Sequence, residues 1–571
     1  MKKEMLSNVW GLTKAYWQSS ERWWARGILS VVVALNLIQV YLLVLFNKWN
    51  NDFYTTLQEY NYEAFGPLIV YFTGIAFLYI IIAVYGIYLR QMLEIRWRTW
   101  MTNSYLDRWM GCQTYYRLQL LDNGGVDNPD QRISDDIGSF VNLFLALALG
   151  FIRQLTTLGA FVFILWDLSG VLEIPLGDTV LSVPGYMVFV TLTYSVVGTW
   201  FAHKVGRKLI TLNYDQQRYE ADFRFSMVRA RENSESIAFY GGERPERVGF
   251  QNRFAMVVQN FWGLMKRTKL LNFYVNSYGQ LATIVPIFMV APRYFAGEIQ
   301  LGGLVQTLTA FGRVQDSLSY FLDAYTSIAQ FAAVIRRLGG FTKHMELVEE
   351  QESQFKVLDQ QEKSLVIKDV QVSLPNGVQL LENLNLTIEP GMSVLVSGAS
   401  GCGKSTLLRV LAGIWPYGQG SITKGDQVQV MFLPQRPYLP LGSLRQAIYY
   451  PQVVPEEDTT DLPALMKRMG IEKLIPQLDV VDDWSRILSL GEQQRLAFIR
   501  ILLFKPQVVF LDESTSAMDE VRERESYEIL KEMLPEMAVV SVGHRSTLLE
   551  QHQYKLLLSG QGKWTLQKIE H

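Results

Sequence analysis

A glycine-rich stretch in the back half of the chain has the residue types and spacing of a phosphate-binding loop. Residues 396–413 read VSGASGCGKSTLLRVLAG and fit the pattern G-x-x-x-x-G-K-S/T. Glycines let backbone N–H groups converge on phosphate oxygens, and the helix expected after the loop adds its positive N-terminal end. We expect Lys404 to reach the β- and γ-phosphates and Ser405 to bind Mg²⁺. The predicted nucleotide-binding residues of the loop are Gly398, Ala399, Ser400, Gly401, Cys402, Gly403, Lys404, Ser405 and Thr406.

Two carboxylates end an apolar strand further along the chain. Residues 507–519 read QVVFLDESTSAMD, and the strand closes with Asp512 and Glu513. A carboxylate at this end can hold Mg²⁺ through water, and the adjacent Glu513 can polarise the water that attacks the γ-phosphate. His544 follows a third expected strand in VVSVGHRS. A lone histidine is usually structural, but its place after a third motif favours a residue that senses the γ-phosphate.

A second anion-binding helix N-terminus is predicted between these motifs. Residues 488–503 read LSLGEQQRLAFIRILL and place Ser489 and Gly491 just before a helix, whose positive end attracts anions. The residues of this motif are Ser489, Leu490, Gly491 and Glu492. Gln435 in FLPQRPYLP completes the set of motifs.

The front half of the chain is dominated by apolar runs. The 571 residues are 49% hydrophobic and 13% aromatic, which a soluble protein of this length rarely reaches. A helix that crosses the hydrocarbon of a membrane needs about 20 mostly apolar residues. Six spans are predicted, at 27–47, 66–89, 141–166, 184–202, 272–292 and 302–322. Arg153 weakens the third span, and Asn272 and Gln280 weaken the fifth.

Charge bias predicts how these spans are oriented. Basic residues gather before span one and after spans two, four and six, whereas the opposite loops are acidic or neutral. We therefore expect both termini and the nucleotide domain in the cytoplasm. The alternative, a large soluble protein with buried helices, does not account for this sidedness. The net charge of −2 gives no support for a nucleic-acid partner, and the two cysteines, Cys112 and Cys402, support no disulfide framework.

Two long polar loops are expected to extend the spanning helices into the cytosol. Residues 90–140 and 203–271 are too polar for lipid and periodic enough for helices. Each is interrupted near its middle, at 120–132 and at 219–229. We expect a short helix at each interruption, which contacts the nucleotide domain.

Polar side chains recur along one broad face of the last span. The series of candidate cavity-lining residues is Gln306, Arg313, Asp316 and Tyr320. Ionisable residues in a span usually face a water-filled cavity or a partner. Two interpretations stay open: a polar cavity wall for a hydrophilic solute, or an Arg313–Asp316 pair that only locks two helices together.

The motifs, in type and order, resemble those of the ABC transporter family over nearly the whole chain. The resemblance implies an α-helical six-span transmembrane domain of the ABC exporter type, followed by an α/β P-loop nucleotide-binding domain. It implies a transmembrane domain at 1–345, a linker at 346–362 and an ATP-binding cassette domain at 363–571, with ATP and Mg²⁺ as cofactors. It implies a signature motif at 488–492, a switch histidine at His544, and metal ligands at Ser405, Gln435 and Asp512.

A chain with one membrane domain and one nucleotide domain resembles a half-transporter. In this family the signature of one subunit closes over the phosphate loop of the other, so the resemblance implies a homodimer. The stretches WNNDFY, DNPDQRISDDI and PRYFAGEIQLGGL resemble the group that joins peroxisomal acyl-CoA transporters of the ABCD type to bacterial SbmA/BacA-like permeases.

The resemblance within that group is greatest to bacterial members that fuse a BacA-like membrane domain to an ATPase. It implies a bacterial inner-membrane protein that contacts lipids and takes up bulky polar or amphipathic solutes, such as peptides, cobalamin or acyl conjugates. An exporter of lipids or drugs and an ATP-gated channel or regulator remain as alternatives. Residues 367–384 offer no aromatic to stack on adenine, which departs from many family members.

Cys402 lies inside the phosphate loop, where backbone amides and Lys404 create a positive field. Such a field favours the thiolate, which is the reactive form of cysteine. We expect Cys402 to react with maleimide in the nucleotide-free protein and Cys112 to be irrelevant to inhibition. The alternative is a small residue that a tight loop tolerates.

Overall fold

The computed structural model describes residues 2–121, 129–176, 179–350, 355–360, 364–425, 428–456 and 460–570. The chain divides into two compact units. The helical unit comprises Met1–Asp107 and Asn128–Lys343, and the α/β unit comprises Arg108–Asp127 and His344–His571.

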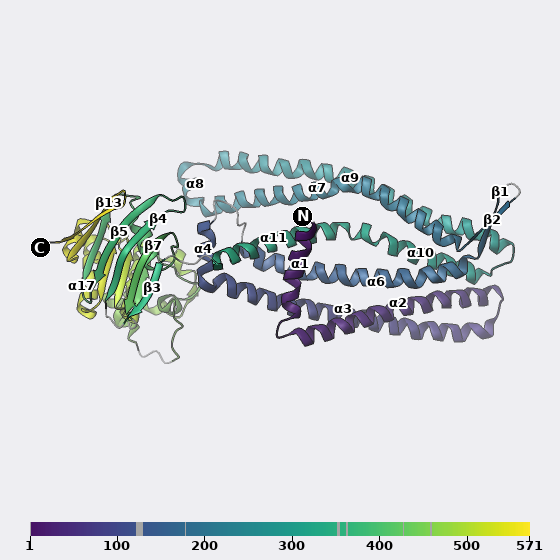
Figure 1. Ribbon diagram of the computed structural model, residues 1–571, viewed down its shortest axis with the longest axis horizontal. Coiled ribbons are helices and arrows are strands. Elements are labelled where there is room, and N and C mark those ends of the chain that lie inside the picture. Colours follow the sequence, from purple (N-terminus) through teal and green to yellow (C-terminus); the bar gives the residue numbers. More distant parts are fainter. Residues whose placement is uncertain are drawn as a thin grey trace. The chain divides into compact units, whose positions relative to one another are not determined.

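Long helices that lie alongside one another build the helical unit (Figure 1). In chain order they are α1 (Lys2–Trp17), α2 (Arg22–Gln58), α3 (Tyr62–Met110), α6 (Ile137–Ser169), α7 (Tyr186–Glu232), α9 (Glu243–Phe295), α10 (Leu301–Asp323) and α11 (Tyr325–Glu350). The short elements are a hairpin of β1 (Val171–Leu176) and β2 (Thr179–Pro184), α5 (Pro129–Gln131), the π-helical turn η2 (Arg132–Asp136) and α8 (Ser234–Tyr240). Helices satisfy their own backbone hydrogen bonds, which lipid requires of a spanning segment.

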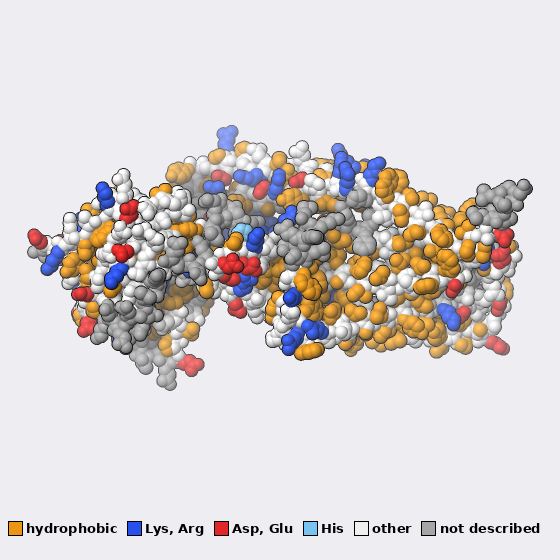
Figure 2. Space-filling model, in the orientation of Figure 1, with side chains coloured by type: hydrophobic (Ala, Val, Ile, Leu, Met, Phe, Trp, Pro, Cys, Tyr) orange, Lys and Arg blue, Asp and Glu red, His pale blue; other side chains and the backbone are white. Residues whose placement is uncertain are grey.

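Among the described residues, four helical stretches are long and apolar enough to cross a membrane: 22–58, 62–120, 129–169 and 243–295. They contain predicted spans one, two, three and five. Spans four and six lie in the long helices α7 and α10, which fall outside this set because their composition is less apolar. Apolar side chains such as Phe77, Ile80 and Val84 are exposed on α3. Figure 2 shows hydrophobic side chains gathered over the region of α2 and α3.

The prediction of a helix break at 219–229 is wrong. This stretch lies inside α7, which runs unbroken to Glu232, and the short helix is α8. The stretch has no glycine or proline that would stop a helix, whereas Gly241 follows α8 in the left-handed region with φ 61°. The other predicted break, at 120–132, falls largely on residues 122–128, which lie outside the described residues.

Two sheets organise the α/β unit. The first has the strand order β14-β13-β6-β12-β11-β8, and its central strands are parallel. Their bounds are β6 Ser393–Gly398, β8 Val430–Leu433, β11 Val508–Asp512, β12 Ala538–Val542, β13 Tyr554–Gly560 and β14 Lys563–Lys568. The strands β6, β11 and β12 are almost wholly buried and rich in valine, as expected for a parallel sheet covered on both faces.

The second sheet has the order β3-β7-β4-β5, with β3 at Phe355–Gln360, β4 at Leu365–Ser373, β5 at Gln379–Ile388 and β7 at Gly418–Gly425. Strand β3 lies within the predicted linker 346–362 and pairs in parallel with β7.

Helices and short elements complete the α/β unit. They are η1 (Gly111–Gln113), α4 (Thr114–Leu121), α12 (Lys404–Leu411), α13 (Leu444–Tyr449), α14 (Leu462–Arg468), η3 (Glu472–Gln477), α15 (Trp484–Ile487), α16 (Leu490–Phe504), α17 (Glu520–Met533) and η4 (Ser546–Gln551), with the two-residue strands β9 (Gly442–Ser443) and β10 (Val481–Asp482). Leu120 of α4 packs against the buried core that includes Leu407 and Val396. The α4 segment thus belongs to the α/β unit although its neighbours in sequence belong to the helical unit.

Candidate functional site

The phosphate loop connects β6 to α12, as the sequence predicts. Gly398 has φ 152°, and a Cβ there would collide with the carbonyl oxygen of Leu558. Gly403 caps α12 with φ 101°, a conformation that L-residues rarely adopt. The Lys404 amine donates to the carbonyl oxygens of Gly398 at 2.9 Å and Ala399 at 3.0 Å. The loop therefore holds a cation at the N-terminus of a helix, which is suited to a phosphate.

Ser405 and Asp512 converge on one point although 107 positions separate them in sequence. The Ser405 hydroxyl donates to Oδ1 of Asp512 at 3.1 Å. Burial raises the pKa of Asp512, and the hydrogen bond from Ser405 opposes that shift. A hydroxyl and a carboxylate oxygen are hard donors, which Mg²⁺ prefers. The residues present therefore fit a magnesium ion.

Glu513 is contacted from both neighbouring strands. The Gln435 amide, which follows β8, donates to Oε2 of Glu513 at 3.1 Å. Nε2 of His544, which follows β12, lies 3.8 Å from Oε1 of the same carboxylate. Glu513 itself has φ 50°, a left-handed conformation directly after β11. The carboxyl ends of parallel strands meet at one edge of a sheet, and this edge brings the three predicted residues together.

The signature motif is held separately from these residues. Ser489 is the N-cap of α16 and forms a capping box with Glu492. Leu490 and Gly491 begin the helix, and a Cβ at Gly491 would lie 2.9 Å from the carbonyl oxygen of Ala517. Within the described residues, no hydrogen bond or ion pair joins Ser489 to the phosphate loop.

Gln494 is a buried residue that the sequence reasoning missed. Its amide nitrogen donates to the carbonyl oxygen of Gln435 at 2.9 Å and to the hydroxyl of Ser516 at 3.3 Å. Its amide oxygen accepts from the backbone N–H of Ala517 at 3.0 Å. Gln494 thus ties α16 to the segments that follow β8 and β11. The sequence gives no distinct signal for it, because Gln494 stands among the other polar residues Glu492, Gln493 and Arg495 at the start of α16.

The structure corrects the expectation that Cys402 is a reactive thiol. Its side chain is only 9% exposed and packs within a core that includes Leu407 and Leu558. Cys112 is the exposed cysteine. The loop folds over its own thiol, so the positive field of the loop does not make Cys402 accessible.

The four candidate cavity residues all lie on α10, but they do not converge. The backbone carbonyl of Gln306 accepts from the Asn47 side chain at 3.0 Å, and the Tyr320 hydroxyl donates to the Leu147 carbonyl at 3.1 Å. Arg313 and Asp316 share no ion pair within the part of the chain that the structure describes, and Asp316 is exposed. These contacts favour neither a closed polar cavity nor the helix-locking pair.

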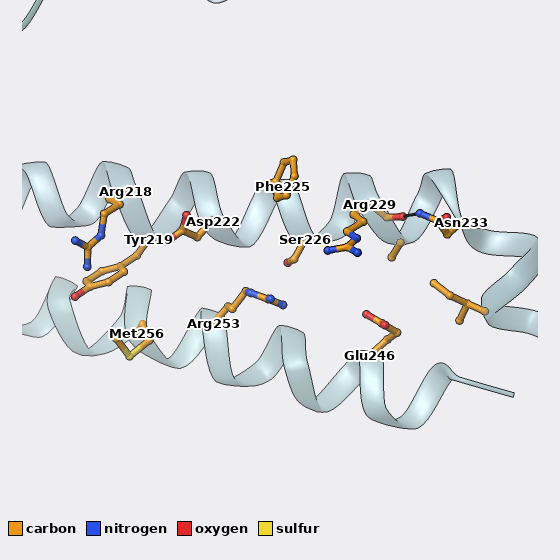
Figure 3. A pocket seen from close by; sticks show the side chains of 12 residues that line it. Arg218, Tyr219, Asp222, Phe225, Ser226, Arg229, Asn233, Glu246, Arg253 and Met256 are labelled. Carbon is orange, nitrogen blue, oxygen red and sulfur yellow. Dashed lines mark hydrogen bonds between the residues drawn. The ribbon is translucent and has the colours of Figure 1, made fainter. Parts of the chain in front are cut away.

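The helical unit has a charged cleft that the sequence reasoning did not anticipate. A cleft of about 850 Å³ lies between α7 and α9 near α8. Figure 3 shows Arg229 and Glu246 extending into the space between the two helices, with Arg253 to one side of them, opposite Ser226. The charged residues that line the cleft are Arg218, Asp222, Arg229, Glu246 and Arg253. The cleft lies in the polar loop at 203–271, outside the predicted spans.

Comparisons with known proteins agree with this architecture. The family described as ABC transporter transmembrane region 2 matches residues 12–295, and the family described as ABC transporter matches residues 381–516. An uncharacterized ABC transporter ATP-binding protein of Haemophilus influenzae is 37% identical, over 94% of this chain and 89% of that protein. The inner membrane ABC transporter ATP-binding protein YddA of Escherichia coli is 33% identical, over 94% of each chain.

More distant relatives extend the comparison. The human lysosomal cobalamin transporter ABCD4 is 26% identical, over 94% of this chain and 92% of that protein. A solved structure of a bacterial Atm1-family ABC exporter with ATP bound has a TM-score of 0.72 at 16% identity and covers 95% of each chain, which shows a shared fold.

The chain belongs to the ABC transporter family. It is an ATP-driven half-transporter whose ATP hydrolysis is coupled to transport across a membrane, and its relatives include the ABCD group. The predicted fold class, an exporter-type helical domain followed by a P-loop ATPase domain, is confirmed. The half-transporter architecture implies that two chains form a dimer.

Proposed function

We propose that the chain is a homodimeric transporter with two composite ATP sites. Each site would comprise the phosphate loop of one subunit, residues 398–406, and the signature of the other, residues 489–492. The observation that carries this proposal is the separation of the motifs within one chain. Ser405, Asp512, Glu513, Gln435 and His544 gather at one sheet edge, whereas Ser489 is bonded to its own helix.

Each gathered residue has a role that its contacts support. Lys404 would bind the β- and γ-phosphates, while Ser405, Asp512 and Gln435 would hold Mg²⁺, which supplies charge neutralisation on the phosphates. Glu513 would polarise the attacking water, because its carboxylate is positioned by Gln435 and lies next to Asp512. His544, at 3.8 Å from Glu513, would contact the γ-phosphate.

We further propose that the transported solutes are bulky and polar or amphipathic, and that the direction is uptake. The relative named as a lysosomal cobalamin transporter supports this class of solute. The relative named as an inner-membrane protein supports a bacterial inner membrane, with both termini and the ATPase domain in the cytoplasm. We assign the transmembrane domain to 1–345 and the ATP-binding cassette domain to 363–571.

Uptake of labelled solutes by membrane vesicles tests this function. Right-side-out and inside-out vesicles that contain the protein are given labelled peptides, cobalamin and acyl conjugates, with and without ATP on the ATPase side. We expect ATP-dependent movement toward the cytoplasmic face, and none with Glu513→Gln. Movement of lipids or drugs in the opposite direction would identify an exporter instead. Solute flux that is not stoichiometric with hydrolysis would indicate a channel.

A further inference from the structure

A buried carboxylate lies directly beside the signature serine. Oε2 of Glu492 accepts the backbone N–H of Ser489 at 2.8 Å and the hydroxyl of Ser489 at 2.6 Å. The Glu492 side chain is 10% exposed. Hydrogen bonds from Lys473 and Ser489 outweigh desolvation and lower the pKa of Glu492 to about 2, so that it carries a negative charge at neutral pH.

This carboxylate conflicts with the task of the signature motif. If the proposed composite site is correct, Ser489 and the N-terminus of α16 face the γ-phosphate of ATP on the partner subunit. A negative charge 2.6 Å from the Ser489 hydroxyl repels that phosphate and competes for the hydroxyl proton. The capping box thus stabilises α16 but weakens the attraction of its positive end for an anion.

Lys473 supplies the opposing charge. Its amine lies 2.5 Å from Oε1 of Glu492, the oxygen that Ser489 does not use. Lys473 comes from η3 (Glu472–Gln477), which precedes the signature in sequence, and its side chain is 70% exposed. Arg495, a cation on α16 itself, donates to the carbonyl oxygens of Gly470 and Gly491. It interacts with Glu492 through its charge only, whereas Lys473 contacts the carboxylate directly.

We propose that Lys473 is a positioning residue of the composite ATP site: it neutralises Glu492 so that the Ser489 end of α16 accepts the partner's γ-phosphate. Lys473 acts through Glu492 and does not itself touch the nucleotide. This inference rests on the proposed function and adds to it a residue outside the known motifs.

The competing explanation is that the Lys473–Glu492 ion pair only stabilises the fold. The exposure of Lys473 gives the two explanations different expected results. An ion pair with a largely exposed partner contributes little to stability. Loss of Lys473 should therefore leave the melting temperature nearly unchanged. The same loss should affect ATP use strongly, because Glu492 keeps its hydrogen bonds from Ser489 and so retains its negative charge where a phosphate must dock.

The test measures ATPase kinetics of the full-length protein in lipid nanodiscs. We expect Lys473→Ala to lower kcat/KM for Mg-ATP by about tenfold, mainly through KM, since one compensating charge corresponds to roughly that factor. Lys473→Arg should stay near wild type. The double variant Lys473→Ala/Glu492→Gln should recover most of the loss, because no charge remains to be compensated. Lys467→Ala is the matched control, because Lys467 is an exposed lysine on the neighbouring α14 and should have no effect.

Two results would overturn the inference. One is an unchanged kcat/KM for Lys473→Ala, and the other is a double variant as impaired as Lys473→Ala alone. Ser489→Arg distinguishes failure of the proposed function. If Ser489→Arg retains turnover, the composite site is wrong; if it is inactive while Lys473→Ala is normal, only the role of Lys473 is wrong.

Discussion

The two units differ in how their polar residues are arranged. In the α/β unit, residues from 405 to 544 meet at one sheet edge, with donor–acceptor distances of 3.1 Å at both Ser405–Asp512 and Gln435–Glu513. In the helical unit, the Gln306 backbone carbonyl and the Tyr320 hydroxyl of α10 bond to different helices, and charged residues gather instead in the α7–α9 cleft. Hydrolysis of ATP requires a few atoms to be held at fixed distances from one another. Binding of a solute during transport can instead be distributed over many weak contacts.

Replacement of Glu513 should have the largest effect on ATP hydrolysis. It tests whether the residues that meet at the sheet edge form a catalytic site. Glu513→Gln can keep the hydrogen bond from Gln435 but removes the carboxylate that polarises the attacking water. We expect steady-state hydrolysis to fall by about 10²–10⁴-fold, while ATP binding persists and the closed dimer accumulates. Near-normal steady-state turnover would refute the role of Glu513.

A change in α8 should uncouple the two units. Phe239 and Tyr240 are exposed aromatics on this short helix. The sequence predicted that a short helix in this loop couples to the ATPase domain, and we propose α8 for that role in place of 219–229. Proteoliposome assays of the double variant Phe239→Ala/Tyr240→Ala should show transport reduced by about tenfold or more, with hydrolysis within about twofold of wild type. Tyr214→Ala removes an exposed aromatic from α7 and should leave transport intact. Normal transport in the α8 variant would contradict the proposed coupling.

Replacement of Arg313 should have a smaller effect, because solute contacts are expected to be distributed. Arg313→Gln should raise the solute KM about fivefold without altering basal hydrolysis or the melting temperature. If Arg313 and Asp316 instead serve only to stabilise helix packing, Arg313→Gln and Asp316→Asn should lower the melting temperature equally. Thermal denaturation of both variants decides between these interpretations.

The smallest effect concerns His552, which is buried in the α/β unit. It bonds to the Leu548 carbonyl and to Ser541, and burial lowers its pKa to about 4. The folded pKa lies below the unfolded value near 6.5, so the unfolded state binds the extra proton, and stability falls as the pH decreases from 6.5 toward 4. The loss should reach about 1.4 kcal/mol at pH 5.5. Denaturation of His552→Gln should depend less on pH over this interval; equal slopes for variant and wild type would exclude the effect.

The same contrast explains what the sequence could predict. The phosphate loop, Gln435, Asp512, Glu513 and His544 could be predicted because each ends or follows a strand of the parallel sheet. A short stretch therefore determines both the residue types and their position at the sheet edge. Gln494 was missed because its partners lie 59 and 22 or 23 positions away, and only packing reveals them. Cys402 was judged from local charge, although its burial depends on Leu558 from another strand.

The helical unit was predictable in its long helices but not in their ends. The end of α8 coincides with Gly241 and Gly242, which follow it, whereas the sequence prediction placed the break at 219–229, inside α7. The α7–α9 cleft depends on which faces of two helices oppose each other across the α8 turn. Residue periodicity predicts a face, but it does not identify the partner of that face.

The most direct test of the composite homodimer is a mixing experiment with Ser489→Arg and Lys404→Ala subunits. Each variant alone should fail to occlude ATP, because every site then lacks either its phosphate-loop lysine or its signature serine. After subunits are co-expressed in equal amounts, one site in each heterodimer is intact, so occlusion should recover to about a quarter of the wild-type level. No recovery, in a mixture in which heterodimers are shown to form, would contradict the account.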